Sequence, residues 1–287
     1  MKVYAIVNPV AGGGYAGEIY RSVLKEFEGF DFDFHLTSGP GNATELAKSA
    51  VEQGYSHLVC VGGDGTLNEI VQAIAHTDIV LVPVSAGTGS DFVKTTSLRD
   101  IPSVVRAMRN GSSSPVDLGK ITREGETRYF LNILEVGFGA QVMQRVNSRK
   151  KVHDGRSFTS AVLASVPSYH PYEVKISHEE GSQSLKIAEM IVANGKYFGG
   201  GMLAAPDAVI DDGLFDVHIV NGAGKIQLLM KLRKLRDGSH VKDIMVTSLK
   251  TSGIRIEGDA PVEIDGENFG TLPIEVSVEK NALRLIS

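Results

Sequence analysis

The chain has very little cysteine: Cys60 is the one thiol among 287 residues. A lone cysteine excludes an intrachain disulfide, and its place in an apolar run predicts a small hydrophobic group in a reducing compartment. The chain also lacks a run of 18 apolar residues, so no transmembrane segment is expected. A signal peptide is not expected either, because the first apolar run stops at Asn8-Pro9. These absences predict a cytoplasmic protein whose membrane contact is peripheral.

An excess of basic charge is missing as well. The 29 Lys and Arg residues are outnumbered by 34 Asp and Glu residues, which gives a formal net charge of −5. No nucleic acid partner is expected, since binders that work through general basicity need the opposite balance. Apolar residues make up 42% of the chain and charged residues 22%, proportions that indicate a folded protein.

Several common site motifs are also absent. The sequence contains no G-x-x-x-x-G-K-[ST] and no convincing G-x-G-x-x-G, the two widespread glycine motifs of nucleotide sites. Its eight histidines show no H-x-x-x-H zinc spacing, and no serine stands in a G-x-S-x-G elbow. We interpret these histidines and serines as structural.

The first third of the chain alternates short apolar runs with helical patterns. Buried strands are predicted at 3–7, 32–36, 57–61 and 79–84, and helices near 19–27, 43–51 and 67–74. Continuous apolar strands between helices are typical of an α/β domain with a parallel sheet covered on both faces.

The pattern changes after the turn-rich stretch 110–115, which we interpret as a domain junction. Strands are then predicted at 129–134, 172–176, 187–192, 215–220, 253–257, 261–264 and 274–278, and helices near 140–149, 157–166 and 225–236. Mostly strands with few helices favour an antiparallel β-sandwich. The predicted domains are 1–112 and 113–287, and the last strand could return to the first domain.

Three predicted strands of the first domain each run into a glycine-rich loop. These loops are 8–14, 62–66 and 85–91. In a parallel sheet the carboxyl ends of the strands share one edge, where ligands bind. Glycine allows the backbone to approach a phosphate, and the N–H groups that open the next helix point at the anion. A single such loop is explained equally well by a tight turn, but three loops on one edge favour a nucleotide site.

The sequence Gly62-Gly63-Asp64-Gly65-Thr66-Leu67-Asn68-Glu69 resembles the signature of the diacylglycerol kinase and sphingosine kinase superfamily, most of all its bacterial lipid kinases. Segments that fit the same family in order and spacing are Asn8-Pro9, 87–92, 117–119, 137–139, 194–201, 212–216 and 265–267. The resemblance implies a phosphofructokinase/NAD-kinase-like first domain. One departure is Ser90, where the family has Asn, because a serine lacks the paired donor and acceptor of an amide.

The resemblance implies ATP as phosphate donor and Mg²⁺ as its counterion. The residues we predict to bind the nucleotide through loop N–H groups, hydroxyls or an amide are Asn8, Gly13, Gly63, Gly65, Thr66, Thr88 and Gly89. A carboxylate beside a triphosphate needs a bridging cation, so Asp64 is expected to hold Mg²⁺ or to take part in catalysis. The alternative is that Asp64 caps a helix beginning at Thr66.

Four further positions are assigned by the resemblance. Asp265 corresponds to the general base, although Asp265-Gly266 alone would indicate a plain hairpin turn. Glu267 is expected to support it, and Asp117 to join the same Mg²⁺ network. Asp212 is expected to bind a structural metal together with a backbone carbonyl near Leu214, and the alternative is a surface turn.

The acceptor is predicted to be a lipid at a membrane surface, with diacylglycerol the best candidate. Eleven of the 29 basic residues form two clusters, namely Arg145, Arg149, Lys150, Lys151 and Arg156, and Lys225, Lys231, Arg233, Lys234, Arg236 and Lys242. Such clusters attract an anionic leaflet, but solvated helix faces with leucines in the core explain them too. The alternatives are a kinase for a soluble acceptor such as NAD, and a non-catalytic nucleotide- or lipid-binding regulator. A homodimer is a further possibility.

Overall fold

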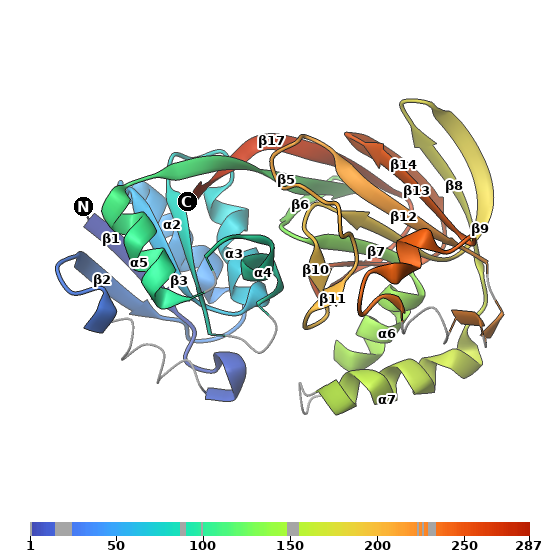
Figure 1. Cartoon of the computed structure of the whole chain (residues 1–287), viewed down its shortest axis with the longest axis horizontal. Coiled ribbons are helices and arrows are strands. Elements are labelled where there is room, and N and C mark those ends of the chain that lie inside the picture. Colours follow the sequence, from blue (N-terminus) through green and yellow to red (C-terminus); the bar gives the residue numbers. More distant parts are fainter. Residues whose placement is uncertain are drawn as a thin grey trace. The chain divides into compact units, whose positions relative to one another are not determined.

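The computed structural model in Figure 1 describes residues 2–14, 25–86, 90–98, 100–147, 155–222, 224–225, 227–228 and 234–287. The chain divides into two compact units. The first unit is Met1–Leu118 together with Glu279–Ser287, and the second is Gly119–Val278. Two strands, β5 (Ser113–Arg123) and β17 (Ile274–Ile286), carry the chain from one unit to the other.

The first unit contains a parallel sheet in the order β2-β1-β3-β4-β17. Its elements are β1 (Lys2–Val7), η1 (Ala11–Gly14), β2 (Asp31–Leu36), α2 (Asn42–Glu52), β3 (His57–Gly62), α3 (Asp64–Ile74), β4 (Val80–Ser85), α4 (Asp91–Thr95) and α5 (Ile101–Asn110). Strands β1, β3 and β4 are almost wholly buried, and Cys60 is a buried free thiol whose pKa is raised by burial. The predicted α/β architecture is confirmed.

The stretch around the predicted junction is more ordered than its composition suggested. Asn110 ends α5, and Gly111 takes the left-handed conformation at its carboxyl end, with φ 66°. Ser113 already begins β5, so the prediction of a turn through 113–115 is wrong. These polar residues form a strand because they pair with β17, which lies far away in sequence. Most of the helix predicted near 19–27 lies outside the described residues, since 15–24 are not among them.

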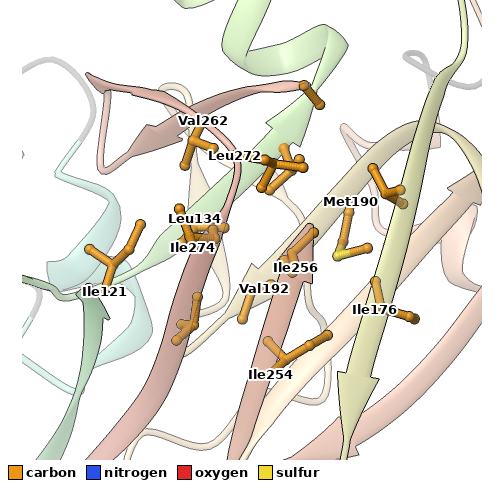
Figure 2. Close-up of a cluster of buried hydrophobic side chains, with 14 of the residues drawn as sticks. Ile121, Leu134, Ile176, Met190, Val192, Ile254, Ile256, Val262, Leu272 and Ile274 are labelled. Carbon is orange, nitrogen blue, oxygen red and sulfur yellow. The ribbon is translucent and has the colours of Figure 1, made fainter. Parts of the chain in front are cut away.

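The second unit is an antiparallel β-sandwich, as predicted. Its strands are β6 (Glu126–Phe130), β7 (Ile133–Gly137), β8 (Tyr172–His178), β9 (Gly181–Ala193), β10 (Tyr197–Phe198), β11 (Met202–Leu203), β12 (Phe215–Asn221), β13 (Val246–Thr251), β14 (Gly253–Gly258), β15 (Pro261–Ile264) and β16 (Glu267–Thr271). Side chains from ten strands meet in one apolar core; Figure 2 shows part of it, with Ile176, Met190, Ile256 and Ile274 pointing inward.

Helices α6 (Phe138–Asn147) and α7 (Gly155–Ser165), with the short 3₁₀ turns η2 (Val166–Ser168) and η3 (Ser239–Lys242), complete the second unit. Part of the helix predicted at 225–236 lies outside the described residues. The single strand predicted at 129–134 is wrong: Leu131 and Asn132 separate β6 from β7. Their backbone N–H groups bind a carboxylate, as described below, and are therefore lost to the sheet.

Candidate functional site

Hydrogen bonds join the first and second glycine loops of the first unit. The side-chain amide of Asn8, at the end of β1, donates to the Thr66 hydroxyl in the first turn of α3 at 2.9 Å. The Asn8 side-chain oxygen accepts the Val10 N–H at 3.2 Å, which shapes the start of its own loop. Asn8 therefore fixes two loops, and direct contact of Asn8 with a nucleotide stays a prediction.

The second and third loops are joined by Asp64. Its two carboxylate oxygens accept the backbone N–H groups of Asp91 and Phe92 at 3.1 Å each. Helix α3 begins at Asp64 itself, with Gly63 in the capping position, so the alternative that Asp64 caps a helix beginning at Thr66 is wrong. The carboxylate instead caps α4, which begins at Asp91. Whether Asp64 also binds a cation stays a prediction.

The amino end of α3 has the properties of an anion site. No described side chain caps this helix of 11 residues. A Cβ on Gly62 would come within 2.7 Å of Thr66, so glycine is required there for packing. A Cβ on Gly65 would meet nothing within 4 Å, and the same holds for Gly13 in the first loop, where φ is +72°. The glycines at 13 and 65 therefore leave open space beside backbone N–H groups, where the helix dipole favours an anion.

The third loop is described only from Ser90 onward. Thr88 and Gly89, predicted to contact the nucleotide, lie outside the described residues, as does Gly87. Ser90 is buried and has left-handed backbone angles, φ 50° and ψ 47°. Its hydroxyl is hydrogen-bonded to the Ser85 hydroxyl at the end of β4. Ser90 thus holds a conformation that asparagine and glycine adopt at lower cost.

Glu69 is a residue of the second motif to which sequence reasoning gave no role. Its carboxylate accepts the N–H groups of Gly41 at 2.8 Å and Ala43 at 3.1 Å, and its carbonyl accepts the Thr44 hydroxyl. Glu69 therefore caps α2, as Asp64 caps α4. Both acidic residues of the motif bind the amino end of another helix, and the motif connects the elements of this unit.

Asp265 is the centre of the candidate site in the second unit. Asp265 and Gly266, with φ 46° and 91°, form the two-residue hairpin between β15 and β16. The Asp265 carboxylate accepts three backbone N–H groups, those of Leu131, Asn132 and Ile133, at 2.7, 3.0 and 3.1 Å. The hairpin turn is therefore present, and the role of Asp265 as general base stays a prediction. Three donors hold the carboxylate in one orientation.

Two buried asparagines surround the same break in the sheet. The Asn194 amide donates to the Leu131 carbonyl at 2.8 Å, and the N–H groups of Asn194 and Gly195 both donate to the Asn132 carbonyl. A Cβ on Gly195 would lie 2.5 Å from the Asn132 side-chain oxygen, so a larger residue does not fit. The motif at 194–195 thus supports the segment that holds Asp265, a role that the family pattern located but did not explain.

Glu267 and Asp117 make other contacts than the predicted Mg²⁺ network. Glu267 in β16 forms an ion pair with Arg128 in β6 at 2.8 Å. Asp117 belongs to the first unit, where it is buried and accepts the Asn281 N–H at 2.8 Å. No group of three His, Cys, Asp or Glu side chains within the described ranges has a geometry suited to a metal. The metal roles of Asp64, Asp117 and Asp212 therefore stay predictions.

Three buried glutamates were missed, and one of them, Glu263, lies close to Asp265. Glu135 in β7 and Glu263 in β15 are hydrogen-bonded to each other, and Glu263 also accepts the Gly266 N–H. Glu189 in β9 accepts the Gly139 N–H in the first turn of α6. Burial raises the pKa of Glu135 to about 7 and the pKa values of Glu189 and Glu263 well above the ordinary range. The signal in the sequence was a glutamate inside each of three apolar strands.

Asp212 lies in the turn before β12, and its carboxylate accepts the Leu214 N–H at 3.0 Å. Its other oxygen lies 3.4 Å from the Lys250 ammonium group, which is also 3.1 Å from Asp216. The backbone at Asp212 thus forms a turn, as the alternative predicted. The ammonium group of Lys250 lies beside the Asp212 carboxylate, where the resemblance implied a metal.

The predicted basic clusters are described only in part. Arg149, Lys150, Lys151, Lys231 and Arg233 lie outside the described residues, and so does the side chain of Arg156. Arg145 donates to the Ala164 carbonyl, Lys225 to the Pro167 carbonyl, and Lys234 pairs with Asp243. Leu228 and Leu235 are buried, as expected for core leucines. In the part of the chain that the structure describes, the helices are all too short or too polar to cross a bilayer.

Comparisons with known proteins identify the family of both parts of the chain. Residues 2–121 match the model of the diacylglycerol kinase catalytic domain, and residues 132–287 match the YegS C-terminal NAD kinase beta sandwich-like domain. Similar proteins include a diacylglycerol kinase of Bacillus subtilis, 28% identical over 94% of this chain and 91% of that protein, and one of Staphylococcus carnosus, 30% identical over 93% and 89%. A crystal structure of a diacylglycerol kinase from Bacillus anthracis shares the fold, with a TM-score of 0.72, 21% identity and 99% and 96% coverage.

Proposed function

Because the chain belongs to the lipid kinase family that combines a diacylglycerol kinase catalytic domain with a YegS-type C-terminal domain, we propose that it transfers the γ-phosphate of ATP to a lipid hydroxyl. Diacylglycerol is the acceptor that the relatives favour. Mg²⁺ accompanies the nucleotide, and the reaction takes place at a membrane surface that the protein contacts peripherally.

The observation that carries the proposal is the coupling of the glycine loops in the first unit. Asn8 binds Thr66, and Asp64 binds the amino end of α4, so the loops after β1, β3 and β4 are held as one group. The uncapped amino end of α3 and the open space at Gly13 and Gly65 suit phosphate oxygens. Phosphoryl transfer depends mainly on such positioning and on charge stabilisation, which fits a site without a protein nucleophile.

Asp265 supplies the base in this proposal. The acceptor oxygen attacks the γ-phosphorus, its proton passes to the Asp265 carboxylate, and the bond to the bridging oxygen of ADP breaks. The three amide donors fix the orientation of the carboxylate that takes the proton.

The test is incubation with γ-labelled ATP, Mg²⁺ and a panel of lipids in mixed micelles, followed by chromatography of the organic phase. We expect label in phosphatidic acid when diacylglycerol is present. Asp265→Asn should lower turnover by roughly 10²- to 10⁴-fold, because Asn suits the left-handed turn but cannot take the proton. Unchanged turnover in the folded variant would remove Asp265 as the base.

The soluble-acceptor alternative predicts label in the aqueous phase. NAD is included in the panel for this reason, since NAD kinases share the Gly-Gly-Asp-Gly-Thr loop. Label in NADP and none in any lipid would overturn the lipid proposal. Nucleotide binding without transfer to any acceptor would favour the non-catalytic regulator.

A further inference from the structure

The turn that leads into β12 is organised around Asp212. One carboxylate oxygen accepts the Leu214 N–H at 3.0 Å, and Gly213 between them takes a left-handed conformation, with φ 73°. This arrangement closes the turn by a local side-chain hydrogen bond. The second oxygen of Asp212 is then directed at the neighbouring strand, where it lies 3.4 Å from the Lys250 ammonium nitrogen.

Lys250 is placed by the register of two strands. Asp216 in β12 and Lys250 in β13 are direct partners across the antiparallel pair. The ammonium nitrogen lies 3.1 Å from a carboxylate oxygen of Asp216. The Asp216 side chain is only 8% exposed, whereas that of Lys250 is 42% exposed. Lys250 thus brings one positive charge to two carboxylates, one of which is largely removed from water.

A divalent cation does not fit this arrangement. The resemblance implied a metal held by Asp212 and a carbonyl near Leu214, but the free oxygen of Asp212 already faces an ammonium group. A cation bound there would lie beside Lys250 and would be repelled by it. No third carboxylate, histidine or cysteine among the described residues completes a metal site.

We propose that Lys250 takes the place of a structural metal at the Asp212 turn, so that the second unit folds without a divalent cation. The ammonium group supplies the positive charge that Asp212 and Asp216 require, and it is delivered by the fold rather than from solution. The proposal does not rest on the proposed function. It confines any need for divalent cations to the nucleotide.

The test is thermal unfolding without nucleotide, in chelator and in millimolar Mg²⁺ or Ca²⁺. The wild-type melting temperature should be the same in all three solutions. Lys250→Met keeps the apolar stem and leaves the charge of Asp216 uncompensated. In chelator, its melting temperature should fall by about 2–4 °C for each kcal/mol by which the free energy of unfolding decreases. Added Mg²⁺ or Ca²⁺ should restore the melting temperature of this variant. The double variant with Asp212→Asn should not be restored, because only the carboxylate of Asp216 then remains to bind a divalent cation.

The matched control is Lys175→Met. Lys175 lies on β8 of the same unit and pairs with Glu257 at 3.4 Å, with both side chains well exposed. This control should show no response to divalent cations. A rise of the wild-type melting temperature with Mg²⁺ or Ca²⁺ would overturn the proposal, and this measurement needs no variant. A loss in Lys250→Met that no cation reverses would reduce Lys250 to an ordinary ion pair and would overturn the proposal too.

Discussion

Glu135 and Glu263 stand directly opposite each other on β7 and β15, and their carboxyl groups are hydrogen-bonded to each other. Their exposed fractions are 4% and 3%. A hydrogen bond between two carboxyl groups requires a proton on one of them. Burial is the main reason that the pKa of Glu135 rises to about 7 and that of Glu263 well above its ordinary range. The pair therefore retains a proton near neutral pH.

This relationship predicts how stability depends on pH. The ordinary pKa of Glu135 is 4.5 and the folded value is about 7, so the folded chain holds more protons between these values than the unfolded chain does. Stability should fall as the pH rises from about 4.5 through 7. Glu135→Gln keeps an amide donor for Glu263 and removes the part of this dependence that comes from Glu135. The free energy of unfolding in urea should be measured for the variant and for the wild type. The variant minus wild-type difference should be larger near pH 8 than near pH 5, by on the order of 2–3 kcal/mol.

The control for this prediction is Glu173→Gln. Glu173 is exposed on β8, and its hydrogen bond to Lys186 lowers its pKa. Because Glu173 loses its proton at a lower pH than Glu135, the stability of the variant should depend on pH as that of the wild type does between about pH 6 and pH 8. A Glu135→Gln curve parallel to that of the wild type would contradict the shared proton.

The sequence predicted the first unit well where burial and periodicity agree. The strands at 3–7, 57–61 and 79–84 are continuous apolar runs because both faces of a parallel sheet are covered. The strand at 113–115 could not be predicted, since serine and proline give no strand pattern and the pairing with β17 decides. Tertiary pairing overrides local preference here.

The site was predicted in its residues but not in its contacts. The interruption between β6 and β7 after Phe130 could not be predicted from the apolar sequence around it. It is caused by hydrogen bonds to Asp265, which lies more than 130 positions away. The capping alternative for Asp64 concerned the helix that follows it in sequence. Its carboxylate instead binds the N–H groups of Asp91 and Phe92 at the amino end of α4. Long-range hydrogen bonds of this kind leave no periodic signal, and only the shared motif order indicated that these residues belong together.

Asp64 can be tested for a role beyond capping α4. Asp64→Asn retains one acceptor for the two α4 N–H groups and loses the charge, whereas Asp64→Ala loses both acceptors. If Asp64 binds Mg²⁺, Asp64→Asn should lose at least about 10²-fold in turnover, far more than its lost hydrogen bond explains. Asp64→Ala should in addition lose about 1 kcal/mol of stability. Wild-type turnover of Asp64→Asn across an Mg²⁺ titration would leave only the capping role.

Ser90 predicts an improved variant. Its left-handed backbone suits asparagine, and an amide offers the donor and acceptor that a hydroxyl cannot combine. Ser90→Asn should lower KM for ATP by roughly 3- to 10-fold, the value of one added hydrogen bond. Ser90→Gly is the matched control, because it relaxes the backbone without adding an amide. The measurement is the KM for ATP of both variants at saturating acceptor. A higher KM in Ser90→Asn than in the wild type would show that the larger side chain does not fit the buried site.

The role of Glu267 can be separated from its ion pair with Arg128. If the pair is only structural, Glu267→Gln and Arg128→Met should each cost about 0–1 kcal/mol of stability and leave turnover unchanged, since both side chains are partly exposed. If Glu267 supports Asp265, Glu267→Gln should lower turnover while Arg128→Met does not. The double variant closes the cycle: a turnover equal to that of Glu267→Gln alone assigns the loss to the carboxylate. Equal losses in both single variants would instead mean that the ion pair itself holds β16, and through it the Asp265 turn, in place.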